Sequence, residues 1–182
     1  MNVGVVGQGF VGTAVYEGLK KHHKLLCYDK DDKVNIKRLG VANLELLAEY
    51  SEIIFVCVPT PMTQDGECYT GYVEEVVKEL DGYTKDKIVV IKSTIIPGTT
   101  ARLNTKYKNN TIVFSPEFLT ERIAKLDMMM QARIIFGGPK ELTEKVEELY
   151  RGRFMNRHFI HTDSTTAEYI KYMNNCFFAT KV

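Results

Sequence analysis

The chain lacks both a long apolar run and a strong excess of charge of one sign. No stretch of its 182 residues approaches the ~20 consecutive apolar residues of a transmembrane helix, so we expect no membrane partner. The formal net charge of +1 creates no global field that would attract nucleic acid. No charged and then apolar leader precedes the first predicted strand, which begins at Asn2, so the sequence favours a cytoplasmic protein.

Cysteine spacing typical of metal or redox sites is also missing. Cys27, Cys57, Cys68 and Cys176 form no Cys-x-x-Cys pair and no Cys/His arrangement with zinc spacing. Cys27 and Cys57 fall within apolar runs, where small buried thiols are common. We therefore expect reduced cysteines and no metal site.

The first segment of the chain carries a glycine motif between an apolar run and an amphipathic helical pattern. In such a motif Gly7 allows a tight turn, Gly9 lets the backbone approach a diphosphate, and Gly12 lets helix and strand pack closely. The N–H groups at the start of the helix would hold the phosphates. The predicted cofactor contacts in this segment are Gly7, Gly9, Phe10, Val11 and Gly12.

An acidic residue follows the second apolar stretch. Asp29 comes directly after residues 24–28, so it should lie at the carboxyl end of the second strand and bind an adenosine ribose. In another interpretation Asp29 merely opens a polar turn, and Lys30 and Lys33 could meet a 2′-phosphate. NAD is the predicted cofactor, with Asp29 and Lys33 among its contacts.

Apolar runs alternate with helical patterns along the rest of the chain. Further strands are predicted at 52–58, 87–92, 111–114, 133–136 and 159–160, and helices at 43–50, from Thr70, at 139–150 and at the end of the chain. This alternation predicts an α/β fold, a Rossmann-type doubly wound parallel sheet with helices on both faces. We expect residues 1–163 to form this domain and residues 164–182 to begin a long connecting helix.

Unusual polar residues follow three of the strands, where ligands bind in such sheets. The segments are Val-Pro-Thr60-Pro, Lys-Ser-Thr94 and Ser-Pro-Glu117-Phe-Leu-Thr-Glu121, and the last helix reads Glu-x-x-Lys171-Tyr-x-x-Asn175. In this order the motifs resemble the N-terminal half of the UDP-glucose and GDP-mannose 6-dehydrogenase family, over essentially the whole chain.

The resemblance implies an NAD-dependent, two-step oxidation of a nucleotide sugar, of the UDP-glucose to UDP-glucuronate type. Thr60 and Thr94 match positions near the nicotinamide half of the cofactor. Lys171 and Asn175 would stabilise the oxyanion formed during hydride transfer. Glu121 and Thr94 would order a water molecule, and Glu117 would act as a nearby base or positioning group.

The residue spacing allows plainer interpretations of the same side chains. Lys171 and Asn175 share a helix face with Glu168, but a solvated ion pair beside a surface asparagine has the same spacing. Glu168 also completes a capping box with Thr165, so we assign it to structure. An acid beside Pro116 at a helix start suits the helix dipole, whereas Glu121 one turn later predicts a carboxylate pair that divides acid and base work.

One part of the family pattern is absent. The family's nucleophile is a cysteine in a Gly-Gly-x-Cys segment, and none of the four cysteines stands in such a segment. The last residues fall inside a helical pattern, so the sequence looks like the front portion of a longer enzyme whose sugar-nucleotide domain is missing. We expect NAD binding without complete turnover, because no thiol traps the aldehyde.

The sequence leaves two alternative functions open and suggests that the chain pairs with a second copy of itself. A 3-hydroxyacid or 6-phosphogluconate-type dehydrogenase fragment would share the glycine motif and the Lys-x-x-x-Asn pair, but would not be expected to carry Ser115 to Leu119. A non-catalytic NAD-binding module is the second alternative. Phe177 and Phe178 on the last helix suggest a homodimer formed through that helix.

Overall fold

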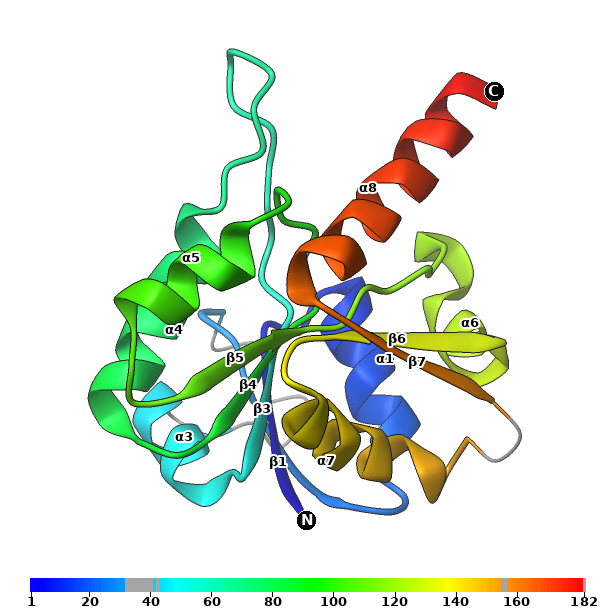
Figure 1. Cartoon of the computed structure of the whole chain (residues 1–182). Helices are drawn as coiled ribbons and strands as arrows, with labels where there is room; N and C mark the ends of the chain where they lie inside the picture. Colours follow the sequence, from blue (N-terminus) through cyan, green and yellow to red (C-terminus); the bar gives the residue numbers. More distant parts are fainter. Residues whose placement is uncertain (32–40, 42, 155–156, 182) are drawn as a thin grey trace.

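The computed structural model describes residues 1–31, 41, 43–154 and 157–181, which form a seven-stranded sheet flanked by helices (Figure 1). The strands are β1 (Asn2–Val6), β2 (Lys24–Tyr28), β3 (Ile53–Val56), β4 (Ile88–Ile91), β5 (Thr111–Phe114), β6 (Arg133–Gly137) and β7 (His158–Thr162). The helices are α1 (Phe10–Leu19), α3 (Leu44–Tyr50), α4 (Gly71–Tyr83), α5 (Thr99–Lys106), the 3-10 helix η1 (Glu121–Ile123), α6 (Ala124–Met130), α7 (Lys140–Arg151) and α8 (Ser164–Lys181). Lys33, a predicted cofactor contact, lies outside the described residues.

The sheet confirms the predicted doubly wound α/β fold, with one exception to its parallel order. The strand order is β2-β1-β3-β4-β5-β6-β7, and the first five strands of this order are parallel. β6 joins β5 in antiparallel sense through one residue pair, Phe114 and Gly137, and β7 is parallel to β6. Since both paired residues are the last of their strands, β6 contacts β5 only at one end, and β6 and β7 extend the sheet beyond that point (Figure 1).

Apolar side chains alternate between the two faces of the central strands and build a core on each. In β4, Val90 packs on the face covered by α1, α6 and α7, and Val89 packs on the face covered by α3, α4, α5 and the first turns of α8. Full burial of one such side chain contributes about 1.5–3 kcal/mol to stability, so these short runs hold the strands firmly. The carboxyl ends of β1, β3, β4 and β5 therefore meet at one fixed edge.

The segment after β5 differs from its predicted form. Residues 115–120 are irregular, and no helix begins at Pro116; η1 begins only at Glu121. The Thr120 N–H donates to the Asp127 carboxylate at 2.7 Å, which ties the end of this segment to α6. Buried Ser115 and Pro116 continue the line of β5, so burial holds the chain extended where an isolated Pro-Glu pair predicts a helix start.

Candidate functional site

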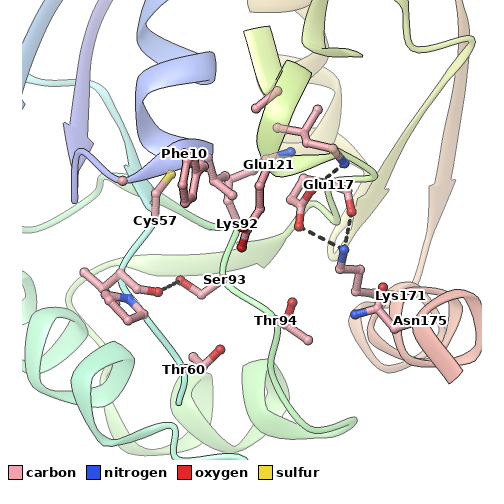
Figure 2. Close-up of a pocket in the computed structure, with 16 residues that line it drawn as sticks. Phe10, Cys57, Thr60, Lys92, Ser93, Thr94, Glu117, Glu121, Lys171 and Asn175 are labelled. Atoms are coloured by element: carbon pink, nitrogen blue, oxygen red, sulfur yellow. Dashed lines mark hydrogen bonds and ion pairs between the residues drawn. The ribbon is translucent and has the colours of Figure 1, made fainter. Parts of the chain in front are cut away.

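A cavity of about 500 Å³ opens at the carboxyl ends of the parallel strands (Figure 2). Predicted residues from five separate segments of the chain meet there. Those that line the cavity are Gly9, Phe10, Val11, Thr60, Thr94, Glu117, Glu121, Lys171 and Asn175. The sheet edge and the first turns of α8 thus form one concave site.

The glycine turn between β1 and α1 has two positions that the fold itself restricts to glycine. Gly7 has φ of 86°, in the left-handed region, and its N–H donates to the Tyr28 carbonyl at 2.8 Å. A Cβ on Gly12 would overlap the Gly7 carbonyl oxygen, as expected for close helix–strand packing. A Cβ on Gly9 would meet nothing within 4 Å. Packing within the fold therefore does not require a glycine at position 9.

The start of α1 faces the same opening. Gly9 is the N-cap residue and provides no side-chain hydrogen bond to the helix, and the first turn holds no acidic residue. Asp29 follows β2 as predicted, and its carboxylate accepts from the Gln8 N–H at 2.6 Å and from the Asp31 N–H at 3.0 Å. Asp29 thus braces the glycine turn from the neighbouring strand, next to the helix N-terminus that favours anions.

Lys171 of α8 forms an ion pair with Glu117 at the side of the cavity (Figure 2). The Lys171 Nζ donates to the Glu117 Oε1 at 2.9 Å and to the Glu117 carbonyl at 2.7 Å, and the Leu119 N–H donates to Oε2 at 2.6 Å. The two side chains are only 7% and 12% exposed. A charge-assisted pair with this burial is held more firmly than a surface pair.

Glu121 does not share a helix face with Glu117, so the predicted carboxylate pair on one helix is wrong. Glu117 lies in the irregular segment before η1, and Glu121 is the exposed first residue of η1. Both nevertheless line the cavity, because the segment after β5 curves around it. Asn175 lies one turn beyond Lys171 and is exposed.

Glu168 is buried and structural, although not through the predicted capping box. Asp163 caps α8 instead, since its carboxylate accepts from the Thr166 N–H at 2.9 Å. The Glu168 carboxylate accepts from the Gly98 N–H at 2.5 Å and from the Thr100 N–H at 2.8 Å, at the start of α5. Glu168 therefore joins α8 to the chain that follows Thr94, on the far side of the cavity from α1.

Two ionisable residues that line the cavity were not predicted from the sequence. Lys92, directly after β4, is 2% exposed, and its Nζ donates to the Ser115 Oγ and to the Pro116 carbonyl, both at 3.3 Å. Burial lowers the pKa of Lys92 to about 8. Cys57, directly after β3, is buried beside it, and burial raises the pKa of the Cys57 thiol to about 12. The sequence feature that could have indicated Lys92 is its place directly after a fully apolar strand, in the segment Lys-Ser-Thr.

The remaining cysteine and acidic side chains of the described residues do not form a further site of a recognised kind. All four cysteines are free thiols in the structure. Within residues 1–31, 41, 43–154 and 157–181, no cluster of His, Cys, Asp and Glu side chains is suited to holding a metal ion. No helix in these ranges has both the length and the apolar surface needed to cross a bilayer.

Comparison with known proteins gives matches over the whole chain. Residues 32–153 match the model of the UDP-glucose/GDP-mannose dehydrogenase family, NAD binding domain. A UDP-glucose 6-dehydrogenase of Rickettsia felis is 30% identical over 217 residues, covering 100% of this chain and 48% of the relative. Among solved structures, a UDP-glucose dehydrogenase of Pyrobaculum islandicum has a TM-score of 0.89 at 24% identity, and a GDP-mannose dehydrogenase of Pseudomonas aeruginosa has 0.88 at 22%. The chain covers 50% of each of these structures. It thus spans about half the length of these relatives.

Proposed function

The chain belongs to the UDP-glucose/GDP-mannose dehydrogenase family, and on that premise we propose that it supplies the NAD-binding half of an enzyme that oxidises the primary alcohol of a nucleotide sugar. The observation that carries the proposal is the shared cavity. The glycine turn and the polar residues after β3, β4 and β5 line one space, together with Lys171 and Asn175. UDP-glucose is the substrate that we propose for the complete site.

The residues present fit the cofactor. The open space at Gly9 and the uncapped start of α1 leave room for a diphosphate, whose charge the helix N-terminus favours. Asp29 lies one strand away, where it would accept hydrogen bonds from the adenosine ribose. NAD, when bound, supplies the acceptor for the substrate hydride. Thr60 and Thr94 would lie beside its nicotinamide half.

The polar groups of α8 have the chemistry to stabilise a developing oxyanion. Lys171 is already held in place by Glu117, and Asn175 is an exposed amide one turn further along the helix. A negative oxygen between these two donors would be stabilised most in the transition state, because the donors are already oriented toward it. Glu117 would accept a proton or position Lys171, while Glu121 and Thr94 would order a water molecule.

The residues of this chain do not supply the covalent step of the proposed reaction. Cys57 lines the cavity, but burial raises its pKa to about 12, and a thiol is a nucleophile only as the thiolate. None of the cysteines stands in a Gly-Gly-x-Cys segment. We therefore propose that the 182 residues bind NAD without completing the oxidation.

Two further proposals concern partners and location. Met173, Phe177 and Phe178 expose large apolar surfaces on the second half of α8, which supports a homodimer through this helix. A cytoplasmic location stays a prediction.

The family match favours a nucleotide-sugar enzyme over a 3-hydroxyacid or 6-phosphogluconate-type dehydrogenase.

Calorimetric titration of the chain with NAD, and then with UDP-glucose, tests the proposal. We expect NAD to bind and no UDP-glucuronate to form after UDP-glucose is added, because the absent thiol is needed for the second oxidation; chromatography of the products measures this. A chain that fails to bind NAD contradicts the proposed function, and formation of UDP-glucuronate contradicts the proposed inactivity. Binding of UDP-glucose to the NAD complex distinguishes a ternary site from a module that only binds the cofactor.

A further inference from the structure

Lys92 places a buried positive charge at the cavity without an anionic partner among the described residues. Both acceptors of its Nζ, the Ser115 Oγ and the Pro116 carbonyl, are uncharged. Lys171 in the same cavity has a carboxylate at 2.9 Å. A buried ammonium usually has such a partner, because neutral acceptors replace its hydration poorly. The two lysines of the cavity thus differ in how their charge is compensated.

The groups around Lys92 compensate its charge only in part, through a carboxylate that Lys171 already holds. The side chains that act on it electrostatically are Cys57 after β3, Glu117 after β5 and Lys171 of α8, and Figure 2 shows Lys92 between Cys57 and Glu117. Cys57 is an uncharged thiol, since burial raises its pKa to about 12. The Glu117 carboxylate is already engaged by Lys171 and by the Leu119 N–H. Two ammonium groups therefore share one part-buried carboxylate.

We propose that the Lys92 ammonium makes the cofactor site prefer the reduced nicotinamide ring to the oxidised ring. The inference rests on the proposed function, in which Thr94, two residues after Lys92, lies beside the nicotinamide. The oxidised ring carries a positive charge and the reduced ring carries none, while the rest of the two cofactors is identical. Like charges in a partly buried site repel strongly, so Lys92 weakens binding of NAD⁺ and leaves binding of NADH largely unchanged.

The preference should depend on pH in a defined direction. Burial lowers the pKa of Lys92 to about 8, so the side chain is protonated below that pH and loses its charge as the pH rises through it. The ratio of the NAD⁺ dissociation constant to the NADH dissociation constant is therefore highest at acid pH. This ratio falls as the pH rises through about 8.

The experiment measures both dissociation constants for the whole chain by calorimetry, at several pH values on either side of about 8. We expect the ratio to fall by about tenfold across this range. Lys92→Arg keeps the charge at every pH, so its ratio should stay high throughout. Lys92→Met removes the charge, so its ratio should be low throughout. Lys87→Met, at the opposite end of β4, should behave like the unmodified chain, because Lys87 does not line the cavity.

The outcomes separate the inference from the proposed function. A chain that binds neither NAD⁺ nor NADH contradicts the proposed function. A chain that binds both forms with a ratio independent of pH overturns the role of Lys92, even where a Lys92 variant fails to fold. The same holds if Lys92→Met folds, binds both forms and keeps the ratio of the unmodified chain.

Discussion

The two halves of α8 differ in what surrounds them, although they form one continuous helix. In the first half Ala167, Glu168 and Lys171 are buried against the sheet and α5. In the second half Phe177 is 58% and Phe178 56% exposed, and Figure 1 shows this end of α8 projecting away from the sheet. Polar contacts hold the anchored half, whereas the projecting half presents apolar surface to its surroundings. In α8, the large apolar side chains therefore do not indicate which half of the helix packs against the rest of the chain.

Ala167, Ile170, Met173 and Phe177 form an apolar stripe in the sequence of α8, which predicts that this face of the helix packs on the sheet. Ala167 is fully buried and Ile170 is partly buried, as the stripe predicts. Met173 is 67% exposed, and Phe177 is exposed as well, so the stripe is wrong over the second half. The helix leaves the sheet after Lys171, and the spacing of apolar residues carries no information about where that happens.

The largest effect is expected from breaking the anchor of the first half. Glu168→Ala leaves the Gly98 and Thr100 N–H groups without their carboxylate in a buried place. We expect the free energy of unfolding to fall by about 3 kcal/mol, because each unsatisfied buried donor costs about 1–3 kcal/mol. Urea unfolding followed by circular dichroism measures this change.

Glu148→Ala is the matched control, since Glu148 is an exposed glutamate on α7. Its substitution should change the free energy of unfolding by less than about 0.5 kcal/mol. Equal effects of the two substitutions would show that Glu168 does not anchor α8.

A much smaller effect on stability is expected in the projecting half. The double substitution Phe177→Gln and Phe178→Gln removes exposed apolar surface and keeps a residue of good helix propensity. The free energy of unfolding should change by less than about 0.5 kcal/mol, while self-association measured by sedimentation should weaken. A loss of stability as large as that of Glu168→Ala would mean that this half packs within its own chain.

The strands were predictable because their signal is local. β3, β4 and β5 are runs of buried apolar residues, and burial on both faces makes such runs continuous. Helix α5 was not predicted, because its sequence has a single buried aliphatic residue, Leu103, beside several threonines. Its start is completed by Glu168, which lies 70 residues from Gly98 in sequence. No local pattern carries that pairing.

The sequence predicted most of the residues of the candidate site, but it did not predict the contacts among them. Motifs after the strands indicated Thr94, Glu117 and Glu121, and the common edge of the sheet brings them into one cavity. Lys92 was not predicted as a site residue, because a lysine at the end of a strand is usually exposed to solvent. Its burial depends on Ser115 and Pro116 of the neighbouring segment, where a helix was predicted to begin at Pro116.

The affinity of Gly9→Ala for NAD shows whether the glycine turn holds the cofactor. The fold leaves open space at Gly9, so the methyl group should change the free energy of unfolding by less than about 1 kcal/mol. Gly82→Ala in α4 is the matched control, because a Cβ there also meets nothing within 4 Å and Gly82 is remote from the cavity. Calorimetry should show NAD binding weakened at least about tenfold in Gly9→Ala and unchanged in Gly82→Ala. Equal affinity of Gly9→Ala and the unmodified chain for NAD would contradict the account.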